Sequence, residues 1–277
     1  MPQKYVLITG CSAGGIGHAL AHAFASHNLL VFATARNISK MSSLKDTPNI
    51  HLLELDVTSL PSIIAAEQAV RAKTGGKLDY LVNNAGVQHV MPLLDVDIDK
   101  AKEAYDTNIW GPLRMVQIFS DLLIEARGMV MNVGSVAGEL YLPMQGIYNS
   151  SKAAMNLLSE TMRLELAPLG IKVITLMTGN VKSHMSDPTA CTSLPSTSRY
   201  LEIKDKLDTT GYSNMPTEKF AKQVVEDMLV GKDGKVWRGL NALTVRLLAH
   251  SLPVWIMDRL MLINGRGLAD MSKAGPK

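Results

Sequence analysis

Short continuous runs of apolar residues alternate with stretches of helical periodicity along most of the chain. The apolar runs are YVLIT (5–9), LLVFATA (29–35), HLLELD (51–56), LDYLVN (78–83), GMVMNVGS (128–135), IKVITLM (171–177) and KVWRG (235–239). The stretches of helical character cover residues 16–27, 60–74, 97–107, 112–127, 147–167 and 215–231. Apolar runs without polar alternation are typical of strands that are buried on both faces. The pattern therefore predicts an α/β fold, a single Rossmann-type domain with a doubly wound parallel sheet.

The alternation loosens over residues 183–215, which are rich in Ser, Thr and Pro. Because long irregular segments inside a compact domain are usually functional, we expect a lid over a substrate pocket. Its apolar side chains either line a pocket for an apolar substrate or cover the end of the sheet. They are Met185, Leu194, Tyr200, Leu201 and Leu207.

The C-terminal residues 240–277 are expected to form a helical extension, and residues 240–264 are strongly apolar. Pro253 and three charged side chains interrupt this stretch, so it is not expected to span a bilayer. Three interpretations stay open. The extension is a helical pair packed on the core and the substrate mouth, a subunit interface, or an amphipathic surface in peripheral contact with a membrane.

Composition narrows the class of protein. Of the 277 residues, 47% are hydrophobic and 19% charged, which is the balance of a soluble globular protein. The net charge of +3, without a run of Lys or Arg, argues against nucleic-acid binding. The two cysteines, Cys11 and Cys191, are too far apart for a zinc site or a disulfide framework. The first apolar run is too short for a signal peptide, so a cytoplasmic location is expected.

A glycine-rich turn, TGCSAGGIG (Thr9–Gly17), lies between the first apolar run and the first helical stretch. Glycines allow the backbone to approach a pyrophosphate, and the helix that follows presents free N–H groups. In this position the turn predicts a dinucleotide site, although a plain turn is the alternative. We expect the cofactor contacts to come from Gly10, Ser12, Ile16 and Gly17.

The second apolar run ends in Ala33-Thr34-Ala35-Arg36, where an enzyme selecting NAD usually carries a carboxylate. A guanidinium there suits the 2′-phosphate of NADP(H), which it can bind through paired hydrogen bonds. Arg36 therefore predicts NADP(H) over NAD(H), and the alternative is a solvated surface arginine.

Two further strand ends are candidates for the adenosine side. Asp56 and Val57 follow the third run, and the carboxylate could accept from the adenine amino group or cap the helix near Thr58. Asn84, in the sequence NNAG (83–86), follows the fourth run, where small residues allow close approach to a cofactor or form a turn.

Tyr148 and Lys152 stand four residues apart at the start of the longest helical stretch, so they share one face. A nearby ammonium is expected to lower the pKa of the phenol. Ser135, just past the fifth strand, could bind a carbonyl oxygen, and Asn108 could hold a water that supplies protons to Lys152. Together they predict a carbonyl-reducing site. An exposed Tyr–Lys contact that merely stabilises the helix is the alternative for the pair alone.

The motifs in this order resemble the short-chain dehydrogenase/reductase family over residues 4–240. They are TGCSAGGIG, LDVT (55–58), NNAG (83–86), Asn108, Ser135 and YNSSK (148–152). Within the family, three segments resemble fungal NADPH-dependent 1-acyldihydroxyacetone-phosphate reductases and relatives, many of which serve secondary metabolism. They are TGNV (178–181), LPSTSRY (194–200) and MPTEKFAKQVVEDML (215–229).

The resemblance implies that Ser135, Tyr148 and Lys152 form the catalytic triad, with Asn108 as its fourth member. It also implies that Lys152 binds the nicotinamide ribose and that Val181 and Ser183 hold the carboxamide.

Two departures from the family pattern stand out. The turn has one residue more than the commoner spacing, because Gly14 and Gly15 are doubled, and Thr178-Gly179 replaces Pro-Gly.

The expected function is NADPH-dependent reduction of a ketone, or the reverse reaction, on a hydrophobic or acylated small molecule. The alternatives are a steroid or polyketide alcohol dehydrogenase and a non-redox NADP(H)-binding isomerase or cyclase. By analogy with the family, we expect a homo-oligomer, either a dimer or a tetramer.

Overall fold

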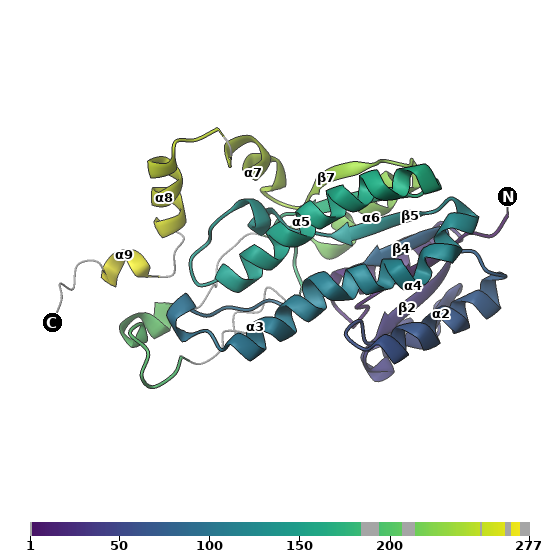
Figure 1. Ribbon diagram of the computed structural model, residues 1–277, viewed down its shortest axis with the longest axis horizontal. Helices are drawn as coiled ribbons and strands as arrows, with labels where there is room; N and C mark the ends of the chain where they lie inside the picture. Colours follow the sequence, from purple (N-terminus) through teal and green to yellow (C-terminus); the bar gives the residue numbers. More distant parts are fainter. Residues whose placement is uncertain (1, 184–193, 207–213, 250, 264–266, 272–277) are drawn as a thin grey trace.

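Seven parallel strands form one sheet in the computed structural model, which describes residues 2–183, 194–206, 214–249, 251–263 and 267–271. The strand order is β3-β2-β1-β4-β5-β6-β7, so the doubly wound sheet is confirmed (Figure 1). The strands are β1 (Tyr5–Ile8), β2 (Leu30–Ala35), β3 (Ile50–Glu54), β4 (Tyr80–Asn83), β5 (Met129–Val133), β6 (Lys172–Thr178) and β7 (Gly234–Arg238). All seven fall within the predicted apolar runs or within one residue of them.

Six helices connect the strands within the described ranges. They are α1 (Ile16–Ser26), α2 (Leu60–Thr74), α3 (Ile98–Tyr105), α4 (Gly111–Ala126), α5 (Gly146–Leu166) and α6 (Thr217–Leu229). The side chains of α1 and α6 pack into one buried cluster, and those of α2, α4 and α5 pack into the other. Along β1, Val6 and Ile8 face the first cluster while Leu7 faces the second. Burial of successive residues on opposite faces explains the continuous apolar runs.

The strand order reverses between β1 and β4, where the chain returns after adding β2 and β3 on the other side. Crossovers run in opposite directions from these two strands, so a crevice opens beyond their carboxyl ends. Gly10 and Asn84 lie at this switch point, since each follows one of the two strands. The fold therefore places the predicted dinucleotide turn where such sheets bind ligands.

A buried chain of polar side chains links β4, β5 and β6 to α5 beneath this crevice. Asn83 donates to the side chain of Asn132 over 2.9 Å, and Asn132 donates to Ser159 on α5 over 3.0 Å. Thr175 on β6 contacts the same Ser159 hydroxyl at 2.7 Å. Buried polar groups need such partners, and these bonds fix the position of α5, which carries Tyr148 and Lys152.

The described part of the predicted lid, residues 194–206, contains the 3-10 helix η8 (Leu201–Lys206). Leu194 and Tyr200 pack against a small buried cluster formed by Val90, Met144 and Ile203. Both expectations for the lid remain compatible with this packing. Met185 and Leu207 lie outside the described residues.

The C-terminal extension forms α7 (Ala242–Leu248), α8 (Val254–Ile263) and α9 (Leu268–Met271). In α7 and α8 only Ala242, Met257 and Met261 are buried, so most of the apolar side chains face solvent. Since α7 nevertheless packs against β7, the three interpretations of the extension stay open. No helix among the described residues is long and apolar enough to cross a membrane.

Candidate active site

The glycine-rich turn connects β1 to α1, and its two doubled glycines take different positions. Gly14 adopts a left-handed backbone with φ of 75°, and Gly15 is the residue before the first turn of α1. No side chain caps this helix, so the N–H groups of its first turn stay available to an anion. Ile16 and Gly17 are the first two helical residues. The helix thus begins directly after the doubled glycines.

Asn84 holds the turn from the neighbouring strand end. Its side-chain Nδ2 donates to the carbonyl oxygens of Thr9 and Gly10 over 2.8 and 3.0 Å. In return the Thr9 hydroxyl accepts from the backbone N–H groups of Asn84 and Ala85. The predicted cofactor residue Asn84 therefore uses its amide hydrogens inside the protein, and Thr9 is a bracing residue that sequence reasoning missed.

Two glycines are required where these strand ends cross. A Cβ added to Gly17 would lie 2.5 Å from the carbonyl oxygen of Gly10 and 2.6 Å from the Asn84 amide nitrogen. A Cβ added to Gly10, whose φ is 74°, would lie 2.9 Å from the Cα of Ala85. Both glycines therefore serve close backbone approach, independently of any contact with a ligand.

Arg36 follows β2 directly and is exposed, and it has no carboxylate partner within the described ranges. Asp56 accepts from the backbone N–H and the hydroxyl of Thr58, at 2.9 and 2.8 Å. This favours the local turn-stabilising alternative for Asp56 over a contact with adenine. Val57 is buried and packs against Gly111, so its backbone alone could face a cofactor.

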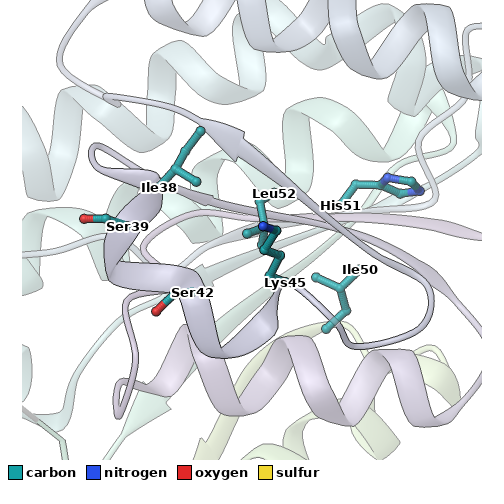
Figure 2. A pocket seen from close by; sticks show the side chains of 7 residues that line it. All are labelled: Ile38, Ser39, Ser42, Lys45, Ile50, His51 and Leu52. Carbon is teal, nitrogen blue, oxygen red and sulfur yellow. The ribbon is translucent and has the colours of Figure 1, made fainter.

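A groove also borders the segment that follows Arg36, between η1 (Ile38–Leu44) and the edge strand β3. Figure 2 shows its lining, which consists of Ile38, Ser39, Ser42, Lys45, Ile50, His51 and Leu52. Since β3 is separated from β5 by three strands, this groove is remote from Ser135 and does not belong to the catalytic centre.

Ser135 lies two residues beyond β5 and begins the 3-10 helix η4 (Val136–Glu139). Its hydroxyl accepts from the N–H of Ala137 over 3.1 Å and forms a hydrogen bond with the side chain of Tyr148. Asn156 on α5 donates to the Ser135 carbonyl oxygen over 3.1 Å. The predicted Ser135–Tyr148 pair is therefore brought together, and Asn156 fixes the backbone of the serine.

Lys152 is buried on α5, one helical turn after Tyr148. Its Nζ donates to the carbonyl oxygen of Val133 over 2.8 Å and lies 5.9 Å from the centre of the Tyr148 ring. Burial disfavours the ammonium form and lowers the pKa of Lys152 from 10.5 to about 8. The side chain is thus a proton carrier that titrates much closer to neutrality than an exposed lysine.

The phenol of Tyr148 behaves differently from the expectation stated above. Burial is the largest influence and raises its pKa above the ordinary value, while the hydrogen bond with Ser135 acts in the opposite direction. Lys152 is not among the influences on this pKa, so the expected lowering by its ammonium is not observed. A protonated phenol near neutral pH is the form that can donate a proton.

Asn108 lies in a π-helical turn (Asp106–Trp110) that joins α3 to α4. Its amide oxygen accepts from the N–H of Val87, and its amide nitrogen donates to the Val87 carbonyl oxygen and to the Ser151 hydroxyl. Both amide hydrogens are therefore engaged by protein. The side chain anchors the loop after β4 and gives no support to the predicted role in holding a water.

Gly86 lies between Asn108 and Lys152, since a Cβ added to it would be 3.2 Å from the amide oxygen of Asn108 and 3.7 Å from the Lys152 Nζ. The structure thus brings all four predicted catalytic residues to one place. Irregular helical turns such as the one around Asn108 are frequent at functional sites.

Val181 and Ser183 follow β6, as predicted. Val181 is buried in the core and pairs with Met215 in an isolated bridge, so its side chain does not face the crevice. Ser183 is half-buried at the end of a described range. Gly179 is required by packing, because an added Cβ would meet the carbonyl oxygen of Leu240.

A pair of glutamines near the triad gave no signal in the sequence. Gln88, in the loop anchored by Asn108, donates from Nε2 to the Oε1 of Gln145, the residue before α5. Gln145 precedes Tyr148 by three residues, so the amide pair borders the catalytic phenol. In the parts of the chain that the structure describes, no group of His, Cys, Asp and Glu could hold a metal ion.

Comparison with known proteins agrees with this geometry. The sequence model of the short chain dehydrogenase family matches residues 4–192. The chain is 43% identical to the short-chain dehydrogenase ptmH of Penicillium ochrochloron, over 93% of this chain and 96% of that protein. It is also 43% identical to an NADPH-dependent 1-acyldihydroxyacetone phosphate reductase of Schizosaccharomyces pombe, over 66% of this chain and 62% of the relative.

Among solved structures, a short chain dehydrogenase from Burkholderia cenocepacia in complex with NADP superposes with a TM-score of 0.76. The alignment covers 93% of this chain and 97% of the other, at 24% sequence identity. Family match, fold and the gathered Ser135, Tyr148 and Lys152 all lead to the same conclusion. The chain belongs to the short-chain dehydrogenase family.

Proposed function

We propose that this protein reduces a ketone to a secondary alcohol with NADPH, or catalyses the reverse reaction, on a hydrophobic or acylated small molecule. The observation that carries the proposal is the arrangement of Ser135, Tyr148 and Lys152. The serine is hydrogen-bonded to the phenol, and the ammonium lies 5.9 Å from the phenol ring. Such a site combines a donor for a carbonyl oxygen, a proton source and a charge that stabilises the phenolate.

The residues at the crevice fit a dinucleotide phosphate cofactor. The first turn of α1 has no side-chain cap, so its N–H groups are available to a pyrophosphate. Exposed Arg36 suits a 2′-phosphate. The choice of NADP over NAD is also supported by the NADPH-dependent Schizosaccharomyces pombe relative and by the NADP-bound Burkholderia cenocepacia structure.

We assign the cofactor contacts to backbone groups and side chains at the strand ends. The contacting residues are Gly10, Ser12, Ile16, Gly17, Arg36, Asp56, Val57, Asn84, Tyr148, Lys152, Val181 and Ser183. For Asp56, Val57, Asn84 and Val181 the contact falls to the backbone, because their side chains are engaged in the protein. The bound cofactor supplies a hydride to the carbonyl carbon.

The chain's own groups manage the proton. The Ser135 hydroxyl donates a hydrogen bond to the carbonyl oxygen and orients it toward Tyr148. The phenol transfers its proton to that oxygen, so the carbonyl becomes a hydroxyl and a phenolate remains. The Lys152 ammonium stabilises the phenolate, and its pKa of about 8 lets it return a proton at neutral pH. Ser135, Tyr148 and Lys152 together thus handle the proton that the reduction requires.

Substrate class is proposed from the surroundings of the triad. Val90, Met144, Ile203 and the packed Leu194 and Tyr200 form an apolar wall near the start of α5. The acylated substrate in the name of the Schizosaccharomyces pombe relative supports the same class. The fungal relatives named only as short-chain dehydrogenases also accord with a role in secondary metabolism.

NADPH oxidation measured at 340 nm against a panel of ketones tests the proposed function. The panel pairs short water-soluble ketones with long-chain acyl ketones, and NADH replaces NADPH in a parallel series. We expect turnover with NADPH that rises with the length of the apolar chain. Binding of NADPH without turnover of any ketone, or of any alcohol with NADP, would contradict the proposal and favour a non-redox isomerase or cyclase.

A homo-oligomer is also proposed, with α4 and α5 as the contact face. Large apolar side chains are exposed on this side, where Leu157 and Leu164 lie seven residues apart on α5 and Trp110 precedes α4. Exposed apolar patches of this kind mark subunit contacts. Sedimentation should give a dimer or a tetramer, and Leu157→Glu together with Leu164→Glu should reduce it to monomers.

A further inference from the structure

The helices α7 and α8 expose an apolar surface that the rest of the described protein leaves uncovered. Leu247 on α7 is 68% exposed, and Val254, Trp255 and Ile263 on α8 are 71%, 68% and 72% exposed. Leu243 on α7 and Leu260 and Leu262 on α8 are also exposed. Helices that expose this many large apolar side chains usually bind a partner or a membrane.

The extension that carries this surface lies beside the catalytic centre. The helix α7 packs against β7 and against η4, which starts directly after Ser135. On α8, Asp258 is hydrogen-bonded to Tyr141, which stands in the loop before Tyr148. Leu268 of α9 packs on the cluster around Met144. In Figure 1 α8 and α9 project from one end of the molecule, and the N-terminus lies at the opposite end.

The charge of the extension identifies the kind of surface that it fits. Residues 240–277 contain five basic and two acidic side chains, and the remaining sequence contains twenty-three of each. The net charge of +3 therefore comes from this segment of the sequence. Of its charged residues, Arg246 lies on α7 and Asp258 and Arg259 lie on α8, and three basic residues lie outside the described ranges. An apolar segment with an excess of basic side chains is attracted to anionic lipids.

The dimensions of α8 accord with insertion into one leaflet only. Ten residues rise about 15 Å as a helix, which is half of the hydrocarbon thickness of a bilayer. Apolar side chains surround most of this helix, and tryptophan, present here as Trp255, is enriched at the boundary between lipid and water. Leu247 and Trp255 thus have the chemistry of membrane anchors.

We propose that the α7–α8 surface docks on the face of a bilayer that contains anionic lipids. The docked orientation presents the catalytic crevice to the lipid, so that an acylated ketone reaches Tyr148 from the membrane. This second part rests on the proposed function, whereas the docking itself does not. Docking buries the exposed Leu247, Val254, Trp255 and Ile263 and places Arg246 and Arg259 near lipid phosphates.

Flotation of the full chain with vesicles tests the docking. Phosphatidylcholine vesicles with about 30% phosphatidylserine are compared with pure phosphatidylcholine. We expect the wild type to float with the anionic vesicles and less with the neutral ones. Leu247→Glu and Trp255→Glu should each weaken binding by about tenfold or more. Val230→Glu is the matched control, because Val230 is 73% exposed but follows α6, outside the extension, and it should float like wild type.

Three results would overturn the docking proposal. One is a wild type that stays at the bottom of the gradient with anionic vesicles. Another is flotation of Leu247→Glu and Trp255→Glu at wild-type levels. The third is a change in oligomeric state, in which Leu247→Glu and Trp255→Glu, but not Val230→Glu, sediment as smaller species. That result would identify the surface as an interface between two copies.

Kinetic constants distinguish delivery of the substrate by the membrane from the chemical step. For a long-chain acyl ketone presented in anionic vesicles, Trp255→Glu should raise KM about tenfold at unchanged kcat. For a short water-soluble ketone, it should leave both constants unchanged. Equal KM values for the vesicle-borne ketone would refute entry from the membrane. Absence of turnover with both ketones would refute the proposed function and leave the flotation result standing.

Discussion

Replacement of Lys152 by methionine should make this protein more stable while removing its activity. The lysine is only 6% exposed, and its Nζ donates a hydrogen bond to the carbonyl oxygen of Val133. Burial lowers its pKa from 10.5 to about 8, which means that the folded protein holds the ammonium at a cost. A methionine has a similar length and no charge, so Lys152→Met removes that cost.

The magnitude follows from the change in pKa. Each pKa unit corresponds to about 1.4 kcal/mol, so a shift from 10.5 to about 8 costs about 3 kcal/mol when the lysine is charged. The variant also loses the hydrogen bond to Val133, which destabilises it by about 1 kcal/mol and reduces its gain in stability by that amount. At pH 7 we therefore expect Lys152→Met to raise the free energy of unfolding by about 2 kcal/mol. The same variant should have no measurable turnover and a weaker affinity for NADPH.

The pH dependence of stability tests independently whether the charged lysine destabilises the folded protein. Between pH 8 and pH 10.5 the unfolded chain keeps the Lys152 proton and the folded protein has lost it, so stability rises with pH. Below pH 8 both states are protonated and the cost is fully present. The advantage of Lys152→Met over wild type should therefore shrink by about 2 kcal/mol between pH 8 and pH 10.

Urea unfolding followed by tryptophan fluorescence at pH 7, 8, 9 and 10 measures both quantities in the two proteins. Subtraction of the two pH profiles removes the contribution of titrating groups that do not interact with Lys152. The reasoning would be refuted by a Lys152→Met protein that is less stable than wild type at pH 7. A constant difference between pH 8 and pH 10 would equally contradict it.

Three further substitutions test separate parts of the site. Tyr148→Phe should lower kcat by about 10³-fold with unchanged NADPH affinity in a fluorescence titration, since the phenol proton is lost and the ring remains; residual turnover near wild type would contradict its role. Arg36→Asp should shift the ratio of kcat/KM for NADPH over NADH by at least about tenfold toward NADH, because a carboxylate repels the 2′-phosphate; an unchanged ratio would remove the assignment. Gly17→Ala should lower Tm by several degrees even without cofactor, as its Cβ would meet the Gly10 carbonyl oxygen at 2.5 Å, and an unchanged Tm would show that the crossing can relax.

Local sequence pattern predicts the sheet well, because strands buried on both faces appear as unbroken apolar runs. The runs at residues 78–83 and 128–135 contain β4 and β5 almost without adjustment. The triad was also predictable, since Ser135, Tyr148 and Lys152 stand at fixed offsets from a strand end and a helix start. Both successes depend on features that are encoded within a few neighbouring residues.

What could not be predicted depends on partners far away in the sequence. Asn84 and Asn108 are suitable ligands by composition, yet their amide hydrogens go to Thr9, Gly10, Val87 and Ser151. The sequence around an asparagine does not indicate which distant residue accepts the hydrogen bonds of its side-chain amide. The apolar extension posed the same problem, because an exposed leucine and a buried one are identical in sequence.

The crossing of Gly10, Gly17 and Asn84 has a consequence for how the glycine-rich turn can vary. Those three residues are interlocked by backbone contact and hydrogen bonds, whereas Gly14 and Gly15 lie between the two fixed ends. The additional residue therefore falls between Gly10 and Gly17, where these contacts do not constrain the backbone. The length of the turn can thus vary while its two ends stay anchored. An insertion there changes the shape of the backbone that faces a pyrophosphate, and it leaves the contacts between the ends of β1 and β4 intact.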